Sequence, residues 1–258
     1  MLIPARYDGT VNASGRSDGV VSRPFIVACD WNGTLVNDGD RSWQAADAVL
    51  GRLGLPSPGR ADFFDRWRLP LGSLFRDLGV PSSQLDGAVR LWNDEVSTRD
   101  AALAPGAIKM VERIRSMGGG VGVVSAAAVE VIERDVARLS LTGIFDFVVG
   151  DAEPKRAALR AIRPDQPAQV VYVGDTEYDI IEARAAGIWA IGYAAGYRPY
   201  TALVTAGADH VIERLDVLPA LLAALYVVVG SPPTSTRAQG PAGPGQGDAC
   251  RKGRTQSG

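Results

Sequence analysis

Short apolar runs alternate with segments of helical periodicity along most of this chain, and this alternation constrains the fold more than any other feature. The runs are rich in β-forming residues and too short for helices, so each predicts a buried strand. Strands that alternate with helices favour a mostly parallel sheet covered by helices on both faces. We expect strands at 25–29, 121–125, 145–149, 170–174 and 188–192, and helices at 105–117, 128–139, 154–162, 177–186 and 213–226.

Residues 37–104 interrupt the alternation. They contain no strand pattern, so we expect an all-helical insertion after the first strand, within an α/β domain formed by 24–36 and 105–230. The helical patterns of the insertion lie at 42–53, 61–67, 71–78 and 82–97.

The two ends of the chain differ from the rest in composition. Residues 1–23 are polar and rich in glycine, which favours a flexible arm. Residues 231–258 are rich in Gly, Pro, Ser and Gln and bury too little apolar surface to offset the entropy of ordering, so we expect a disordered tail.

Composition and charge exclude several classes of protein. The formal net charge is −2 and no basic stripe is visible, which argues against a nucleic-acid or membrane-surface protein. The longest apolar stretch, 217–229, is interrupted by Pro219 and is too short for a membrane span. We see no signal-peptide pattern, and Cys29 and Cys250 suggest no disulfide framework. These features predict a cytoplasmic protein.

An acidic residue ends the first expected strand. The segment Phe25-Ile-Val-Ala-Cys-Asp-Trp-Asn-Gly-Thr-Leu-Val36 places Asp30 directly after a buried run. Open α/β sheets bind their ligands at the carboxyl ends of strands, so Asp30 is a candidate nucleophile or metal ligand. The alternative is a hairpin turn, because Asn-Gly between apolar runs is a strong hairpin signal.

Two further candidates follow later in the chain. Ser125 ends the strand at 121–125, where its hydroxyl and the N–H of Ala126 can hold a phosphate oxygen, although a serine there is more often a turn residue or helix cap. Lys155 lies at the start of an expected helix, where a cation is electrostatically disfavoured. It is either a solvated surface lysine or a charge that serves the site.

A pair of aspartates follows the strand at 170–174. Asp175 ends this strand, and Asp179 lies four residues further on, near the start of a helix. Both carboxylates can reach one site, and such oxygen ligands suit Mg²⁺. The alternative is that aspartates at this position cap the helix.

Taken together in this order, these four segments resemble the motifs of the haloacid dehalogenase superfamily, over residues 24–212. The resemblance implies a Rossmann-like α/β fold, and the insertion resembles the small helical cap of the phosphoglycolate phosphatase-like branch. It implies a Mg²⁺-dependent phosphatase of a small phosphorylated metabolite.

The resemblance also implies a role for each site residue. Asp30 would form an aspartyl-phosphate, and Asn32 would offer its backbone carbonyl to Mg²⁺. Ser125 and the N–H of Ala126 would hold the phosphate, and Lys155 would neutralise charge between Asp30 and the phosphate. Asp175 would be the main side-chain ligand of the metal, with Asp179 in support.

Residue 32 departs from the phosphatase pattern, which has an aspartate at this position. That aspartate protonates the leaving oxygen and later deprotonates water, and the amide of Asn32 can do neither. Acid–base help of this kind contributes about 10²- to 10⁴-fold. We therefore expect slow turnover; the alternatives are a phosphatase restricted to good leaving groups such as acyl phosphates, or a non-catalytic protein that binds a phosphorylated ligand.

The insertion offers candidates for substrate contact. Its segment 63–71 mixes aromatic residues with cations, and in caps of this superfamily such residues meet the non-phosphate end of the substrate. Arg68 is the first candidate and Arg66 the second, although either can equally lie solvated on a helix face. The sequence predicts neither the metabolite nor the oligomeric state.

Overall fold

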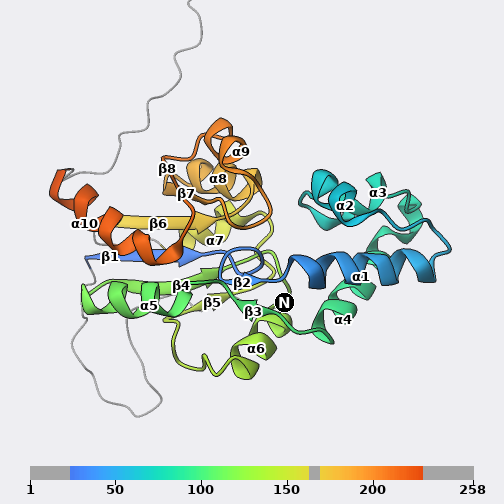
Figure 1. Cartoon of the computed structure of the whole chain (residues 1–258), viewed down its shortest axis with the longest axis horizontal. Helices are drawn as coiled ribbons and strands as arrows, with labels where there is room; N and C mark the ends of the chain where they lie inside the picture. Colours follow the sequence, from blue (N-terminus) through green and yellow to red (C-terminus); the bar gives the residue numbers. More distant parts are fainter. Residues whose placement is uncertain (1–23, 163–168, 229–258) are drawn as a thin grey trace, which may run out of the picture.

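The computed structural model describes residues 24–162 and 169–228. Its main element is a six-stranded sheet (Figure 1). The strand order is β5-β4-β1-β6-β7-β8, and all neighbouring strands are parallel. The bounds are β1 Phe25–Cys29, β4 Gly120–Val124, β5 Val148–Val149, β6 Gln169–Gly174, β7 Trp189–Tyr193 and β8 His210–Ile212. The expected α/β fold is confirmed.

The central strands align their carboxyl ends. Strand β1 pairs with β4 on one side and β6 on the other, and Cys29 lies opposite Val123 and Val173. Because the three strands run in the same direction, the residues that follow them share one edge of the sheet. This register brings together segments that are far apart in the sequence.

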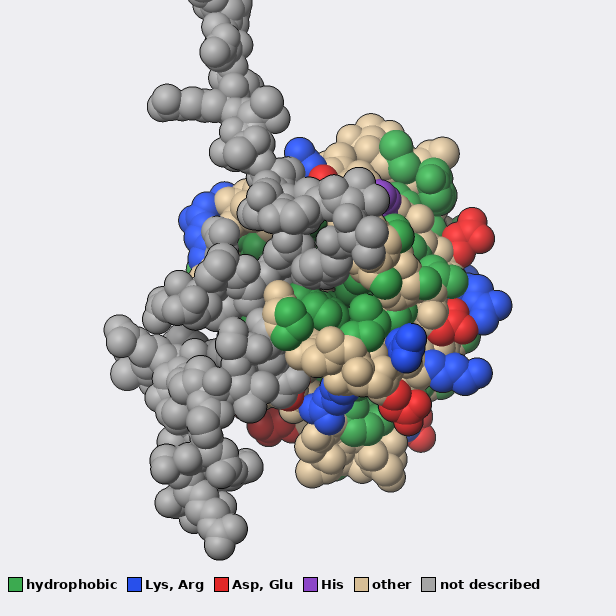
Figure 2. All heavy atoms as spheres, turned by 90° about the vertical axis from the view of Figure 1, so that its left-hand side faces the viewer, with side chains coloured by type: hydrophobic (Ala, Val, Ile, Leu, Met, Phe, Trp, Pro, Cys, Tyr) green, Lys and Arg blue, Asp and Glu red, His purple; other side chains and the backbone are tan. Residues whose placement is uncertain are grey.

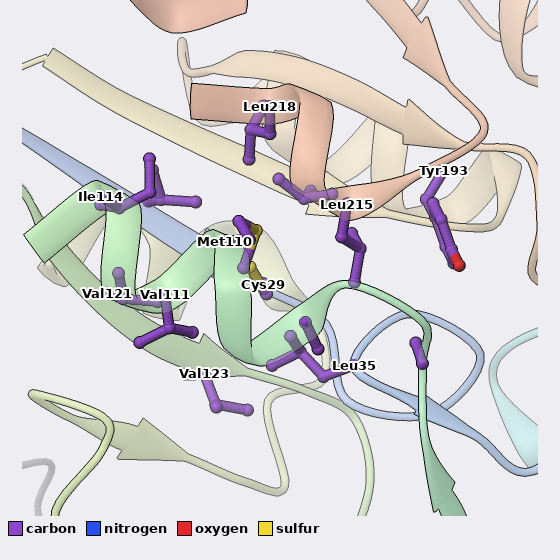
Figure 3. Close-up of a cluster of buried hydrophobic side chains, with 14 of the residues drawn as sticks. Cys29, Leu35, Met110, Val111, Ile114, Val121, Val123, Tyr193, Leu215 and Leu218 are labelled. Atoms are coloured by element: carbon purple, nitrogen blue, oxygen red, sulfur yellow. The ribbon is translucent and has the colours of Figure 1, made fainter. Parts of the chain in front are cut away.

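Both faces of the sheet are covered, as the apolar runs require. Alternate residues of β1 point to opposite faces: Val27 and Cys29 join one hydrophobic cluster, Ile26 and Ala28 another. Figure 3 shows part of the first cluster, where Cys29 lies beside Met110. The first face packs against α5 Ala107–Ser116, α6 Val129–Arg138 and α10 Leu218–Val228, and the second against α7 Lys155–Ala161, α8 Glu177–Ala185 and α9 Tyr200–Thr205.

The insertion is helical and has its own hydrophobic cluster. Two short antiparallel strands, β2 Val36–Asn37 and β3 Ala102–Leu103, pair where the chain leaves and rejoins the sheet domain. Between them lie α1 Gly39–Arg52, α2 Arg60–Arg66, α3 Leu71–Asp77, the 3₁₀ turn Ser82–Gln84 and α4 Leu85–Ser97. This cluster also takes in Val131 of α6, so the insertion rests on the sheet domain beyond the carboxyl edge of the strands.

Polar contacts tie the insertion to the sheet domain. Arg41 of α1 is buried and forms an ion pair of 2.7 Å between its Nη1 and Oδ2 of Asp135 on α6. The indole N–H of Trp31, next to Asp30, donates to the same carboxylate at 3.1 Å. On the other side, Nη1 of Arg198 donates to the carbonyl of Phe64 at 2.7 Å. The structure therefore describes the insertion closed over the sheet edge.

The far end of the molecule, away from the insertion, has a different surface. Figure 2 views this end and shows apolar side chains in its middle, with Lys, Arg, Asp and Glu side chains interspersed on the described part of its rim. None of the helices in the described ranges has the length and apolar character that crossing a bilayer requires.

Most elements lie where the sequence predicts them, within a few residues. The prediction of no strand in 37–104 is wrong at Asn37 and at β3. Strand β8 and helix α9 were not predicted. All of these elements are short. The division into an α/β domain and an insertion at 37–104 stays a prediction. The flexible arm at 1–23 and the tail at 231–258 lie outside the described residues.

Candidate active site

Asp30 lies at the centre of the site. Its backbone N–H continues the β-ladder by donating to the carbonyl of Val173 at 2.8 Å, which fixes it just past the end of β1. The side chain is only 6% exposed, and its Oδ1 accepts from the backbone N–H of Trp31 at 2.8 Å. The chain thus holds a carboxylate in a fixed orientation at the middle of the sheet edge.

Lys155 provides the cation beside this carboxylate. It is fully buried, and its Nζ lies 2.9 Å from Oδ1 of Asp30 and 2.6 Å from Oδ1 of Asp179. Burial alone lowers the pKa of an ammonium group, but the adjacent charges of Asp179 and Asp30 raise the pKa of Lys155 above its ordinary value. Lys155 is therefore a permanent positive charge, not a solvated surface lysine.

Asp175 and Asp179 are the other two carboxylates near Asp30. Asp175 follows β6, where its Oδ1 accepts from the hydroxyl of Thr34 at 3.0 Å and its Oδ2 from the backbone N–H of Tyr197 at 2.8 Å. Asp179 forms a capping box at the start of α8, because its Oδ2 accepts from the N–H and the hydroxyl of Thr176. The helix cap considered from the sequence is therefore real, yet Asp179 also faces Lys155.

The three carboxylates form a group that could hold a metal ion. One oxygen each of Asp30, Asp175 and Asp179 lies within 4.8 Å of the others, and all three residues are buried. Burial and the charge of Asp179 raise the pKa of Asp30 and Lys155 and Ser125 lower it, with a net value of about 6. Burial, with the charges of Asp179 and Asp30, also holds the pKa of Asp175 well above its ordinary value.

The charges in this group do not balance. In the described part of the chain, the ion pairs of the three carboxylates involve Lys155 alone. Buried charges without a partner are expensive, so the fully ionised group needs further positive charge. Hard oxygen donors of this kind fit Mg²⁺. Asp179 is the weakest of the three candidate ligands, since it is engaged both by the ion pair with Lys155 and by the cap of α8.

Glycines make room for Asp175. A Cβ on Gly33 would lie 2.2 Å from Oδ2 of Asp175, and one on Gly196 would lie 2.4 Å from the same oxygen. Gly33 also has φ +78°, a conformation that side chains rarely adopt. Any side chain at either position would push Asp175 out of the group.

Ser125 and Ala126 lie at the third strand end. The N–H of Ser125 donates to the carbonyl of Val149, and its Oγ accepts from the N–H of Ala127 at 3.2 Å. Both Ser125 and Ala126 line the cavity that contains Asp30 and Lys155. The structure thus brings together seven of the eight residues predicted for the site: Asp30, Asn32, Ser125, Ala126, Lys155, Asp175 and Asp179.

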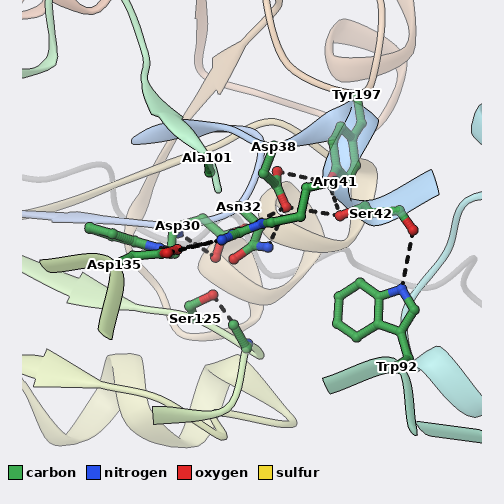
Figure 4. A network of polar contacts seen from close by, with 12 residues as sticks. Asp30, Asn32, Asp38, Arg41, Ser42, Trp92, Ala101, Ser125, Asp135 and Tyr197 are labelled. Atoms are coloured by element: carbon green, nitrogen blue, oxygen red, sulfur yellow. Dashed lines mark hydrogen bonds and ion pairs between the residues drawn. The ribbon is translucent and has the colours of Figure 1, made fainter. Parts of the chain in front are cut away.

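Asn32 lies at the wall of the same cavity, and its amide is held by the insertion. Its Nδ2 donates to Oδ2 of Asp38 at 2.5 Å, while its Oδ1 is buried and has no hydrogen-bond partner among the described residues. Asp38 in turn accepts from Ser42 at 2.8 Å and from the hydroxyl of Tyr197 at 2.9 Å. Figure 4 shows Asn32 between Asp30 and Asp38.

Arg68 is the predicted site residue that the structure does not bring into the cavity. Its guanidinium is about half exposed and forms an ion pair of 2.7 Å with Asp77 at the end of α3. Arg66 likewise pairs with Asp62. The neighbours of Arg68 in sequence, Trp67 and Leu69, line the cavity instead.

Sequence reasoning missed three residues that hold the site. Thr34 lies within the first motif, four residues after Asp30, so its hydroxyl was a visible signal. Asp38 precedes α1, and an acidic residue before a helix is a known capping signal. Tyr197 gives no such signal, because it meets Asp38 across 159 residues of sequence.

Several phosphatases are similar in sequence to this chain. A chain of 29% identity over 227 residues, covering 76% of this chain and 92% of its own length, is a plasmid-encoded phosphoglycolate phosphatase of Cupriavidus necator. Phosphoglycolate phosphatase 1 of Pseudomonas aeruginosa is 22% identical, over 80% of this chain and 83% of its own length. These similarities support the expected class, a phosphoric monoester hydrolase.

The fold has relatives among solved structures. A predicted phosphatase from Clostridium acetobutylicum superimposes with a TM-score of 0.70 at 19% identity, covering 78% of this chain and 99% of its own. The model of the family described as haloacid dehalogenase-like hydrolase matches residues 27–193, which include every motif considered above. The chain therefore belongs to the haloacid dehalogenase-like hydrolase family.

Proposed function

We propose that this chain is a Mg²⁺-dependent phosphatase of a small phosphorylated metabolite, and that it acts through an aspartyl-phosphate on Asp30. The observation that carries the proposal is the charge of the buried group: three carboxylates lie together, and the one lysine beside them, Lys155, pairs with only Asp30 and Asp179. A divalent cation supplies the missing charge and, when bound, neutralises the phosphate.

The residues have complementary roles in this proposal. Asp30 and Asp175 hold the cation, with Asp179 and the backbone carbonyl of Asn32 in support. The Ser125 hydroxyl and the N–H of Ala126 bind phosphate oxygens at the cavity wall. Lys155 keeps Asp30 ionised and attracts the phosphate, and phosphoryl transfer depends largely on such positioning and charge neutralisation.

The relatives support a small substrate. Two of them are named for phosphoglycolate, a small phosphoester. The closed insertion also leaves a cavity of about 30 Å³ beside Asp30, room for about one or two water molecules. This space is too small for a phosphorylated substrate, so the insertion has to move to admit one.

Asn32 favours a second candidate function, a protein that binds a phosphorylated ligand without hydrolysing it. Its amide cannot deliver the proton that an alcohol leaving group needs. Every other part of the site is present, and for this reason the phosphatase is the first choice.

One experiment separates the two functions. The purified protein is incubated with p-nitrophenyl phosphate and with phosphoglycolate, with Mg²⁺ and after chelation, and released phosphate is measured. We expect turnover that chelation removes and that Asp30→Asn lowers by at least about 10⁴-fold, as for loss of a nucleophile. Tight binding of phosphorylated ligands without any turnover would show that the binding protein is the right assignment.

A further inference from the structure

The cavity beside Asp30 has one charged wall and one apolar wall. The sheet domain contributes Asp30 and Lys155. The insertion contributes side chains that carry no charge: Trp67, Leu69, Leu71 and Trp92. A leaving group that points away from the phosphate therefore meets aromatic and aliphatic surface.

Among the described residues that line the cavity, no cation is free to pair with a second anionic group of the substrate. Lys155 is the only cation that lines the cavity in the described part of the chain, and two carboxylates already hold it. The arginines around the cavity are paired with carboxylates: Arg41 with Asp135 and Asp38, Arg68 with Asp77, and Arg198 with Glu177. A carboxylate on the leaving group would lie on apolar surface without a counter-ion, which is unfavourable.

Proton donors at the cavity wall are also engaged. The Asn32 amide donates to Asp38, and the Tyr197 hydroxyl has its hydrogen-bond partners in Asp38 and Ser42. The Thr176 hydroxyl donates to Asp179 at 2.6 Å. The atom of Asn32 that stays without a partner is Oδ1, which only accepts hydrogen bonds. This oxygen can accept a hydrogen bond from an attacking water, but it has no proton to donate to the leaving oxygen.

We infer that the preferred substrates are acyl phosphates with a small, uncharged, apolar acyl group, and that Asp38 is a positioning residue that turns the Asn32 amide away from the leaving oxygen. The inference rests on the proposed function. A carboxylate departs without a proton, so it does not need the acid that position 32 lacks. An alkyl phosphate does need it.

The bonds and protons balance without another reactant. A carboxylate oxygen of Asp30 attacks phosphorus, and the bond from phosphorus to the acyl oxygen breaks, its electron pair leaving with the carboxylate. Water then attacks the phosphorus of the aspartyl-phosphate and frees Asp30. The products are a carboxylate and inorganic phosphate, and the protons of the water pass to phosphate and solvent.

The test compares matched substrates and a swapped pair of residues. The value of kcat/KM is measured with Mg²⁺ for acetyl phosphate, ethyl phosphate, 2,2,2-trifluoroethyl phosphate and phosphoglycolate. The double variant Asn32→Asp/Asp38→Asn keeps an amide–carboxylate pair and the net charge but moves the acid to the cavity wall. The single variant Asn32→Asp is less informative, since two carboxylates in contact would share a proton.

For the wild-type protein we expect acetyl phosphate to be best and phosphoglycolate poorest, with trifluoroethyl phosphate at least about ten-fold above ethyl phosphate because its alcohol leaves more easily. Since positioned acids contribute about 10²- to 10⁴-fold, the swap is expected to reduce the ratio of acetyl to ethyl phosphate by at least about ten-fold.

Two results would overturn the inference and leave the proposed function intact. One is a wild-type preference for phosphoglycolate or for ethyl over trifluoroethyl phosphate, which needs no variant to fold. The other is a folded swap variant, checked by its circular dichroism and melting temperature, with an unchanged ratio of acetyl to ethyl phosphate. No turnover of any of the four substrates would overturn the proposed function and the inference together.

Discussion

The two walls of the cavity differ in the chemistry of their side chains. On the sheet side, polar groups are buried and hydrogen-bonded: Asp30 and Asp175 follow strand ends, and Lys155 begins α7 beside them. On the insertion side, the cavity is lined by Trp67, Trp92 and two leucines, and none of the charged side chains described in the insertion lines it. The polar wall on the sheet side is suited to one reaction at the phosphate. The apolar wall on the insertion side decides which leaving groups bind well.

Because of this difference, substitutions on the two sides of the cavity should have different effects on stability and on substrate choice. Changes on the sheet side disturb buried charges, and their effects on stability and turnover should be large. Changes on the insertion side alter contacts with the leaving group, and their effects should depend on the substrate. Substitutions on each side test this division between stability and specificity.

Removing the buried cation should have the largest effect on stability. Lys155→Met leaves Asp30 and Asp179 facing each other without a counter-ion, and breaking a buried pair in this way costs about 3–5 kcal/mol. Urea unfolding in a chelator measures the change. Lys109→Met is the matched control, because Lys109 is exposed on α5, and it should change stability by less than about 0.5 kcal/mol. Equal effects of the two variants would contradict the division.

The second-largest effect should be a pH dependence of stability that comes from the titration of Asp30. Burial raises its pKa from 3.8 to about 6 in the folded protein, so the folded state holds this proton more tightly than the unfolded state does. Its contribution is therefore fully present below pH 3.8 and is lost as the pH rises through about 6. The loss amounts to about 3 kcal/mol.

Asp30→Asn isolates this contribution, because it removes the titrating group. In a chelator, the wild-type protein should lose about 2.4 kcal/mol more than the variant between pH 4 and pH 7, because part of the titration lies below pH 4. With Mg²⁺ the wild-type loss should shrink, since an ion that binds the folded state stabilises it. Parallel pH profiles for the two proteins would show that Asp30 does not carry the raised pKa.

Adding charge to the insertion wall should change specificity more than stability. Leu69 lines the cavity and is only partly buried, so Leu69→Lys can place a cation near the leaving group. A partly exposed ion pair contributes up to about 1 kcal/mol, which corresponds to at most about a five-fold rise in kcat/KM for phosphoglycolate. Leu69→Gln is the uncharged control. An equal rise with acetyl phosphate would argue against an effect of charge.

Arg68→Ala should have the smallest effect. Its guanidinium pairs with Asp77 on the surface, and such pairs contribute about 0–1 kcal/mol. We expect turnover of acetyl phosphate and phosphoglycolate within about two-fold of wild type. A selective loss with phosphoglycolate would restore the sequence-based interpretation of Arg68 as a substrate contact.

The fold and the site differ in how far the sequence predicts them. Asp30, Ser125 and Asp175 were predictable because each follows a buried run, and parallel strands bring such positions to one edge. Strands β2 and β3 were missed because two-residue strands carry no periodicity. The pattern at Arg68 could not show that Asp77 would take its charge, since that contact depends on how α2 and α3 pack.

The same limit applies to Asn32. Its identity is visible in the sequence, and so is the chemistry that an amide lacks. The direction in which its amide points depends on Asp38, whose own orientation depends on Tyr197 in a distant loop. Contacts of this kind come from tertiary packing, which no local pattern encodes.

The most direct test of the account is to trap the covalent intermediate. Because Asn32 cannot deprotonate water, the aspartyl-phosphate should break down slowly and accumulate. The protein is mixed with ³²P-labelled acetyl phosphate and Mg²⁺, quenched in acid and treated with hydroxylamine. We predict a protein-bound label that hydroxylamine removes and that is absent from Asp30→Asn or without Mg²⁺. Phosphate release by the wild-type protein with no such label, or a label that persists in Asp30→Asn, would contradict the account.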